Sequence, residues 1–465
     1  IAEQPKGDNA QDEVTWEQSV LIKSVCENVI PKLVAEDIPL FHNLLSDVFP
    51  GAEAPQVEMA ALRQAISSIC KKKALVDTEV WVEKILQLYQ IQIIRHGVML
   101  VGPSGSGKTT AWTVLLEALE MTTKVKSESY VLDPKAITKD QLFGSLESTT
   151  REWTDGLFTG ILRKIIDNLR GESEKRHWII FDGDVDPEWV ENLNALLDDN
   201  KLLTLPNGER LALPDNVRII FEVQDLKYAT LATVSRCGMV WFNEDTISNA
   251  VIYDNYLTCL RKVPLDEQER ASLTEGSPVP SGLAIQRQCA DIIQPMFAPG
   301  GFVDQSLAMA AKCNHIMEFT RFRVLNSMMS LINRAILNVI EYNARHSTPM
   351  SADVMQKYIE NRVVFAVMWG FGGSMNLTER ESFSRFVQSI ATTNMPSYLT
   401  GNDAPPLLDY VPMIEDGEWR PWANRVPRME IETHQAASPD LVIPTVDTVR
   451  HVEVVKAWLS EHRPL

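Results

Sequence analysis

The sequence predicts an α/β fold, in which a parallel β-sheet carries helices on both faces, followed by an all-α part. Between residues 97 and 241, short apolar runs typical of buried strands alternate with helical segments. A glycine-rich loop separates the first of these runs from an amphipathic helix. Beyond residue 249 the strand-like runs stop, and apolar residues recur with a helical period.

The first hundred residues are expected to be mostly helical. Residues 1–16 are polar and acidic and are expected to form a linker. Helical periodicity starts near Trp16 and continues to Ile30, where Pro31 interrupts it. Further helices are expected at 40–48, 58–73 and 79–95.

Five strands are expected in the central part of the chain. They comprise residues 98–101, 130–132, 178–181, 217–221 and 238–241, and helical segments such as 158–169 lie between most of them. Asn207-Gly208 stands between two short apolar runs, a strong signal for a β-hairpin spanning 202–213.

The last part of the chain is expected to be helical with one irregular connector. Residues 395–430 are rich in Pro and Trp and lack a helical period, so a connector with short strands is expected there. The predicted helices comprise residues 249–262, 284–294, 304–318, 320–343, 351–370 and 446–459.

Composition narrows the functional classes. The chain of 465 residues has 62 acidic and 44 basic side chains, a net charge of −18, which disfavours general nucleic-acid binding. No apolar run approaches the ~20 residues that a membrane span needs. The six cysteines form no C-x-x-C pair and no zinc-ligand spacing with histidine, which favours a reducing compartment. The chain begins at Ile1, and both ends are expected to continue in a longer protein.

The strongest motif is the glycine-rich loop after the first predicted strand. It fits G-x-x-x-x-G-K-[ST], in which glycines let backbone N–H groups converge on phosphate oxygens at a helix N-terminus. Lys108 is expected to reach the β- and γ-phosphates, and Thr109 to offer its hydroxyl to Mg²⁺. The predicted ATP-binding residues here are Gly102, Pro103, Ser104, Gly105, Ser106, Gly107, Lys108, Thr109 and Thr110.

A second motif is the apolar run 178–181 that ends in Asp182. This is the Walker-B pattern, in which the aspartate holds the metal ion, here through water. Hydrolases of the common strand-inserted class carry Glu next, as the base that activates water, but this chain has Gly183. Asp184 and Asp186 are interpreted as a polar turn and a helix N-cap before a proline.

Two further polar residues are candidates. Gln224 follows the strand 217–221 and could lie beside the γ-phosphate, although a loop-facing glutamine is nearly as compatible with the sequence. Arg236 stands in a turn just before the strand 238–241, where an arginine finger directed at a neighbouring nucleotide is one interpretation and a surface charge another.

These motifs, in this order and with a helical tail, resemble the AAA+ family of ring ATPases. Three segments narrow the resemblance to the second AAA+ module of cytoplasmic dynein heavy chains, and two late segments resemble the start of the third. The first three are FDGDVDPEWVE at 181–191, LTLPNGER at 203–210 and ATVSRCG at 232–238; the late ones are GEWRPW at 417–422 and IPTVDTVRH at 443–451.

The resemblance implies a P-loop large α/β subdomain and an α-helical small subdomain. It divides the chain into a linker from a preceding module (1–24), the large subdomain (25–245), the small subdomain (246–375), a connector (376–440) and the start of a following module (441–465). It also implies an adenine-side contact at Leu33 and Val34, and a sensor-II arginine that is either Arg323 or Arg321.

The resemblance further implies a role in a motor. The family carries six such modules in one polypeptide ring that moves toward microtubule minus ends, in the cytoplasm and on the cytoskeleton. The second module is expected to bind ATP and Mg²⁺ without hydrolysis, to supply Arg236 to the preceding module, and to contact the mechanical linker through residues 151–156, for which a plain surface loop is equally expected. The alternative is an active P-loop ATPase or kinase, which needs a base that the sequence does not display.

Overall fold

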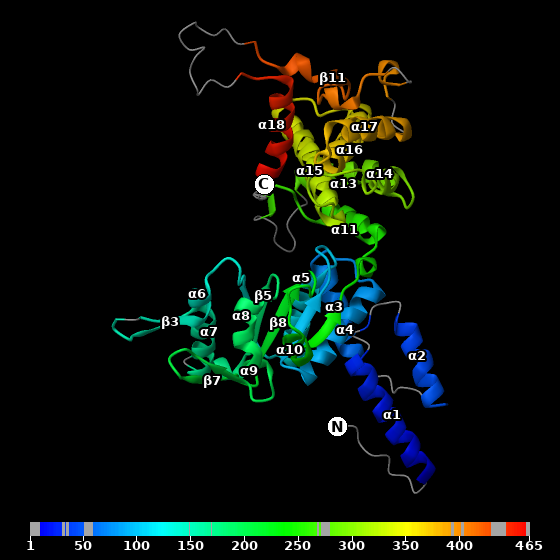
Figure 1. Cartoon of the computed structure of the whole chain (residues 1–465). Coiled ribbons are helices and arrows are strands. Elements are labelled where there is room, and N and C mark those ends of the chain that lie inside the picture. The colour runs from blue at the N-terminus through cyan, green and yellow to red at the C-terminus, as the bar shows by residue number, and fades with distance from the viewer. Residues whose placement is uncertain are drawn as a thin grey trace. The chain divides into compact units, whose positions relative to one another are not determined.

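The chain divides into two compact units, Ile1–Ser248 and Asn249–Leu465, which are described separately (Figure 1). The computed structural model describes residues 10–29, 33, 37–50, 59–147, 149–168, 170–266, 269–270, 280–391, 395–400, 404–428 and 443–461. None of the helices in these ranges is both long enough and apolar enough to cross a membrane.

The first unit begins with the helices that the sequence predicts. They are α1 (Ala10–Val29), α2 (Asp37–Val48), α3 (Ala60–Lys72) and α4 (Glu79–Ile94). The linker expected over residues 1–16 is wrong from Ala10 onward, because α1 already begins there. Gln and Glu are good helix formers, so a helix can begin before the apolar periodicity that marks its packed part. Residues 1–9, Ile30 and Glu58 lie outside the described part.

The five predicted strands are confirmed and form one parallel sheet. They are β1 (Gly97–Val101), β2 (Ser127–Leu132), β5 (Arg176–Asp182), β8 (Val217–Val223) and β9 (Gly238–Trp241). Their order is β2-β5-β8-β1-β9, and all neighbouring pairs are parallel. Strand β8 therefore lies between β1, which leads into the glycine-rich loop, and β5, which ends in Asp182.

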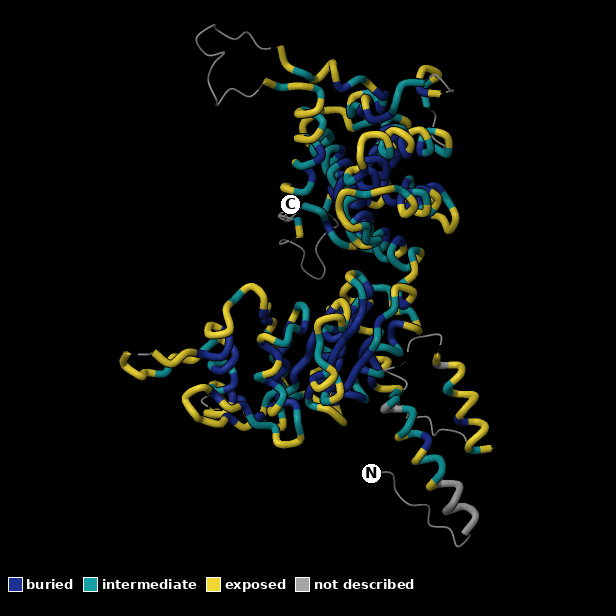
Figure 2. Tube along the Cα trace, in the orientation of Figure 1, coloured by how far each residue is buried: buried dark blue, intermediate teal, exposed yellow. Residues whose placement is uncertain are grey.

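Side chains alternate between two cores, one on each face of the sheet. On one face Leu100, Ile180 and Ile220 pack with residues of α3, α4 and α5 (Lys108–Thr123). On the other face Phe181 and Phe221 pack with residues of α7 (Leu157–Ile166) and with the short helices α8 (Pro187–Val190) and α9 (Asn194–Leu197). The strands β1, β5, β8 and β9 are accordingly mostly buried, whereas the edge strand β2 is buried only at Leu132 (Figure 2).

Two hairpins project from this framework. β6 (Leu202–Thr204) and β7 (Arg210–Ala212) pair antiparallel, as the Asn-Gly signal predicts. A second hairpin, which the sequence does not predict, pairs β3 (Gly144–Leu146) with β4 (Trp153–Asp155). The remaining short elements are α6 (Lys139–Phe143), α10 (Leu231–Arg236) and single 3₁₀ turns.

The second unit is helical and has its own core. Its helices are α11 (Asn249–Lys262), α13 (Ser281–Ile293), α14 (Phe302–Ala310), α15 (Arg321–Arg345), α16 (Ala352–Gly372), α17 (Leu377–Ile390) and α18 (Val446–Leu459). The predicted short strands are present as an antiparallel pair, β10 (Tyr410–Pro412) and β11 (Trp419–Pro421). Buried Asn361 on α16 donates to the Gly417 carbonyl at 2.8 Å, which fastens the turn between these strands to the helices.

The helix predicted over 304–318 is wrong at its end, because α14 stops at Ala310. His315 accounts for the stop. Its Nε2 lies 2.8 Å from the Ala310 carbonyl oxygen, and its backbone pairs with Met375 in an isolated bridge. A backbone that pairs with a distant residue cannot at the same time continue the helical hydrogen-bond ladder.

Candidate functional site

The glycine-rich loop lies between β1 and α5, at the carboxyl edge of the sheet. Its first backbone N–H, at Gly102, donates to the Val223 carbonyl at 3.1 Å. A Cβ at Gly102 would lie 2.1 Å from the Phe242 carbonyl oxygen, and one at Gly107 would lie 2.7 Å from Trp81 Nε1. Gly107 also has a φ of +86°, a backbone conformation that residues other than glycine rarely adopt. Both glycines are therefore required by the path of this loop.

The loop has the properties of an anion site. The first N–H groups of α5 have no partner within the helix, and the helix dipole makes this end positive. The Ser106 hydroxyl is buried and has no hydrogen-bond partner within the described part of the chain. A buried orphan hydroxyl beside unpaired N–H groups fits a ligand with several acceptor oxygens, as a phosphate has.

Lys108 lies over the loop that contains it. Its Nζ donates to the carbonyls of Gly102 at 2.6 Å and Pro103 at 2.9 Å. Burial lowers the pKa of Lys108, and the negative charges of Glu222 and Asp182 act in the opposite direction. The ammonium is therefore already inside the loop and next to acidic groups.

The structure adds Glu222 of β8 to this site. Thr109 Oγ1 donates to Glu222 Oε1, and Trp112 Nε1 donates to Glu222 Oε2 at 3.1 Å. Glu222 pairs in register with Asp182 of the neighbouring strand β5, and its side chain is only 8% exposed. Sequence reasoning missed it, although a carboxylate within the apolar run from Val217 to Val223 is a signal, because buried charges need a reason.

Trp81 is a second residue that sequence reasoning missed. It comes from α4, and its Nε1 donates to the Gly107 carbonyl at 3.3 Å. The contact fastens the start of α5 to a helix that precedes the sheet. The motif gives no signal for it, since Trp81 lies outside the loop and reads as an ordinary core residue.

Strand β5 delivers Asp182 at its carboxyl end, where the side chain is exposed. The next residue, Gly183, has φ of +140°. Asp184 forms an ion pair with Lys135 at 2.6 Å. Asp186 caps α8 by accepting from the Glu188 N–H at 3.0 Å, which confirms the predicted N-cap.

The other predicted contacts of the nucleotide lie as follows. Gln224 is exposed in the bend that follows β8, and Thr110 is half-buried on α5. Ser104 is exposed at the tip of the loop, between half-buried Pro103 and Gly105. Leu33 is half-buried in a bend, and Val34 lies outside the described residues.

Arg236 ends α10 and is paired inside its own unit. Its Nε donates to Asp198 Oδ1 at 2.5 Å, and its Nη1 donates to the Ala232 carbonyl at 2.7 Å. The side chain keeps 31% of its surface exposed, so part of the guanidinium remains accessible.

The two candidate sensor-II arginines lie at the start of α15 in the second unit. Arg321 Nη1 donates to Asn249 Oδ1 at 3.1 Å. Arg323 Nη2 donates to the Glu318 carbonyl at 2.9 Å and to Ser374 Oγ at 3.3 Å. Burial lowers the pKa of Arg323, and its Nε is buried without a partner in the described part of the chain.

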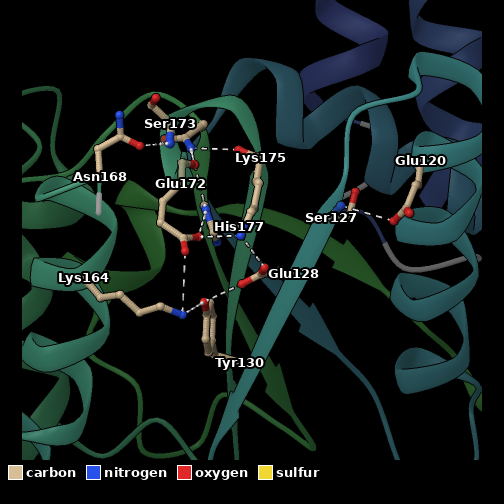
Figure 3. A network of polar contacts seen from close by, with 11 residues as sticks. Glu120, Ser127, Glu128, Tyr130, Lys164, Asn168, Glu172, Ser173, Lys175 and His177 are labelled. Carbon is tan, nitrogen blue, oxygen red and sulfur yellow. Dashed lines mark hydrogen bonds and ion pairs between the residues drawn. The ribbon is translucent and has the colours of Figure 1, made fainter. Parts of the chain in front are cut away.

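A second charged cluster lies at the opposite edge of the same sheet (Figure 3). Its centre is Glu172, which is 1% exposed and precedes β5. Lys175 Nζ lies 3.2 Å and Lys164 Nζ 4.0 Å from its carboxylate, and His177 Nε2 lies 3.4 Å away. Lys175 also pairs with Glu128 at 2.8 Å, and this hydrogen bond lowers the pKa of Glu128 to about 2.

Comparison with protein families identifies the chain. The model described as "Hydrolytic ATP binding site of dynein motor region" matches residues 3–109, and "AAA domain (dynein-related subfamily)" matches residues 97–237. "Dynein heavy chain AAA lid domain" matches residues 293–424. The chain belongs to the dynein heavy chain family. The predicted dynein resemblance and the AAA+ α/β-plus-helical fold are thereby confirmed.

Curated dynein heavy chains are similar over almost all of the chain. "Dynein heavy chain, cytoplasmic" of Dictyostelium discoideum is 57% identical over 97% of this chain, and that of Drosophila melanogaster is 52% identical over 100%. The Caenorhabditis elegans protein is 48% identical over 97%. In each case the chain spans about a tenth of the relative's length, since the matched share is 10%.

The chain is therefore an AAA module of a dynein motor with a nucleotide-binding site of the ATP-binding type. The match to the hydrolytic ATP-binding-site model ends at Thr109. It does not extend to Asp182 and Gly183, where the water-activating group of such a site would follow.

Proposed function

We propose that this dynein module binds ATP with Mg²⁺ and does not hydrolyse it on the timescale of the motor. The single observation that carries the proposal is the combination of an intact phosphate loop with Gly183 directly after Asp182. Binding needs donors and a metal ligand, whereas hydrolysis also needs a positioned base.

The residues of the loop fit the ligand by their chemistry. The N–H groups at the start of α5 and the buried Ser106 hydroxyl would donate to phosphate oxygens. Lys108 would exchange its bonds with the Gly102 and Pro103 carbonyls for the β- and γ-phosphates. Thr109 and Asp182 would hold Mg²⁺, which neutralises phosphate charge when bound. The proposed set has three further parts. They are a contact on the γ-phosphate side from Gln224, contacts on the adenine side from Leu33 and Val34, and a sensor-II arginine that is Arg321 or Arg323.

Other acidic groups near Asp182 are poorly suited to act as the base. Asp184 is held by Lys135, and Asp186 is used as a helix cap. Both oxygens of Glu222 accept hydrogen bonds, from Thr109 and Trp112. Losing a positioned base costs ~10²–10⁴-fold in rate, which is enough to turn a working site into a static one.

The alternative is an active ATPase module, and Glu222 is the observation that favours it. Its carboxylate is at the site and accepts a hydrogen bond from the Thr109 hydroxyl, which would serve the metal.

One measurement distinguishes the two proposals. The chain is loaded with γ-labelled ATP and Mg²⁺, and release of labelled phosphate is followed in single turnover. We expect bound ATP to persist for many minutes. Turnover near once per second that is lost in Asp182→Asn would overturn the proposal.

We propose that Arg236 acts on the nucleotide of the preceding module. Its half-exposed guanidinium is paired with Asp198, so it would exchange that pair for a γ-phosphate across the boundary. Arginine fingers contribute ~10³–10⁵-fold in rate. Arg236→Ala in the complete motor should therefore depress ATPase activity while nucleotide remains in this module, and unchanged activity would refute the assignment.

The remaining assignments follow from membership of the motor. We propose that the partners are the neighbouring AAA+ modules of one polypeptide, the linker through residues 151–156, and the microtubule through the complete motor in the cytoplasm. Neither nucleic acid nor a membrane is a proposed partner. The proposed domain boundaries are those given by the resemblance, with the large subdomain ending at 245 and the small one at 375.

A further inference from the structure

Glu222 differs from an ordinary buried carboxylate in the partners that it has. Its side chain is 8% exposed, yet in the described part of the chain its hydrogen bonds come from a threonine hydroxyl and a tryptophan N–H, and no ion pair is formed. A buried carboxylate is normally neutralised by a cation. Lys108 interacts electrostatically with Glu222, but its ammonium is hydrogen-bonded to the loop carbonyls.

The hydrogen bond from Thr109 fixes the direction of that hydroxyl. Because Thr109 Oγ1 gives its proton to Glu222, its lone pairs point away from the carboxylate and are available to a cation. The register of β5 and β8 places Asp182 next to Glu222 at the same edge. Two carboxylates and one lysine give this corner a net charge of −1 before any ligand binds.

That charge acts in opposite directions on the two components of the ligand. A divalent cation is attracted to the corner and finds the Thr109 oxygen already turned toward it. A triphosphate without a cation is repelled by the carboxylate that Glu222 adds to that of Asp182, because charges in a partly desolvated site interact strongly. The two ligands should therefore bind cooperatively, each improving the affinity for the other.

We propose that Glu222 is a positioning residue that makes ATP binding by this module conditional on a divalent cation. This inference rests on the proposed ATP site and deepens it. Glu222 orients the Thr109 hydroxyl for the cation and opposes ATP that arrives without one. The module would thereby be loaded with the metal complex of ATP rather than with free ATP.

The test compares ATP affinity in excess Mg²⁺ with ATP affinity in EDTA, by calorimetric titration of the whole chain. The ratio of the two dissociation constants measures the coupling. Because a glutamine amide at 222 would meet the Trp112 N–H, the substitution Glu222→Gln is made in a Trp112→Phe background, and Trp112→Phe alone is its reference. The matched control is Glu117→Gln, which removes an exposed carboxylate from α5, the helix that carries Trp112.

We expect Glu222→Gln to reduce the ratio by about tenfold or more, within the range of ordinary coupling between sites, mainly by improving ATP binding in EDTA. Glu117→Gln should leave the ratio unchanged. Glu222→Asp keeps the charge, so it should retain most of the ratio, and it provides the test if the neutral variant does not fold. An unchanged ratio in Glu222→Gln, or a ratio in Glu222→Asp as low as in the neutral variant, would overturn the role of Glu222. Failure of the unaltered chain to bind ATP in Mg²⁺ would overturn the proposed function as well.

Discussion

Two buried glutamates at opposite edges of one sheet are held in opposite ways. Glu172 has two lysines and a histidine around its carboxylate, so its charge is balanced by the protein itself (Figure 3). Glu222 has a hydroxyl and an indole N–H, so its charge is left to act on whatever enters the site. A carboxylate that is balanced internally serves the fold, whereas one that is unbalanced beside a phosphate loop serves a ligand.

Glu172 also illustrates why spacing alone does not make a metal site. Ligand atoms of Glu128, Glu172 and His177 lie within 4.8 Å of one another, a spacing that a metal ion could bridge. Lys175 already pairs with both carboxylates, at 2.8 and 3.2 Å. We therefore assign this cluster to stability, where it joins β2, β5 and the turn before β5.

The largest expected effect is on stability at the balanced glutamate. Glu172→Ala should lower the free energy of unfolding by about 3 kcal/mol, because it removes the charge-assisted hydrogen bond from Lys175 and the ion pair with half-exposed Lys164. Glu222→Gln should cost only about 1 kcal/mol, since one hydrogen bond is perturbed. Urea unfolding of both variants measures the difference. Glu174→Ala, an exposed neighbour of Glu172, is the control. Equal losses at Glu172 and Glu222 would break the comparison.

A second prediction concerns the lysines of the two edges. Lys108→Ala should weaken ATP binding tenfold or more, about 1.5–3 kcal/mol, because a charge-assisted bond to phosphate is removed. Stability without nucleotide should change less than ATP affinity, since the hydrogen bonds of Lys108 within the described residues go to carbonyls of its own loop. Lys175→Met should show the reverse, with lower stability and normal ATP affinity. Titration and thermal melting of both variants test the assignment, which fails if Lys108→Ala binds ATP normally.

The smallest expected effect is the acid sensitivity of the balanced cluster. The hydrogen bond from Lys175 lowers the pKa of Glu128 from 4.5 to about 2. A carboxyl with a lowered pKa in the folded state contributes stability above pH 4.5 and loses it as the pH falls toward 2. The decline in urea midpoint between pH 5 and pH 3 should therefore be shallower in Glu128→Gln. Identical slopes would show that Glu128 carries none of this stability.

The sequence predicts the central sheet well because all five strands are short apolar runs set between helices. The phosphate loop can also be predicted from the sequence, since the local geometry of the loop requires glycine at 102 and 107 and places Lys108 inside the loop. Glu222 could not be placed, because its contacts with Thr109 and Trp112 are made across more than a hundred residues. The end of α14 was missed for the same reason, since His315 pairs with Met375 of a distant segment.

The backbone at Gly183 limits which residue can follow Asp182 in this turn. There is room for a side chain there, because a Cβ would meet nothing closer than Asp133 Oδ1 at 3.7 Å. The obstacle is the backbone, whose φ of +140° suits glycine and strains other residues. The substitution Gly183→Glu would thus place a carboxylate on a main-chain conformation that is strained for glutamate. For a glutamate to be held there without strain, the turn after β5 would have to adopt a different backbone conformation.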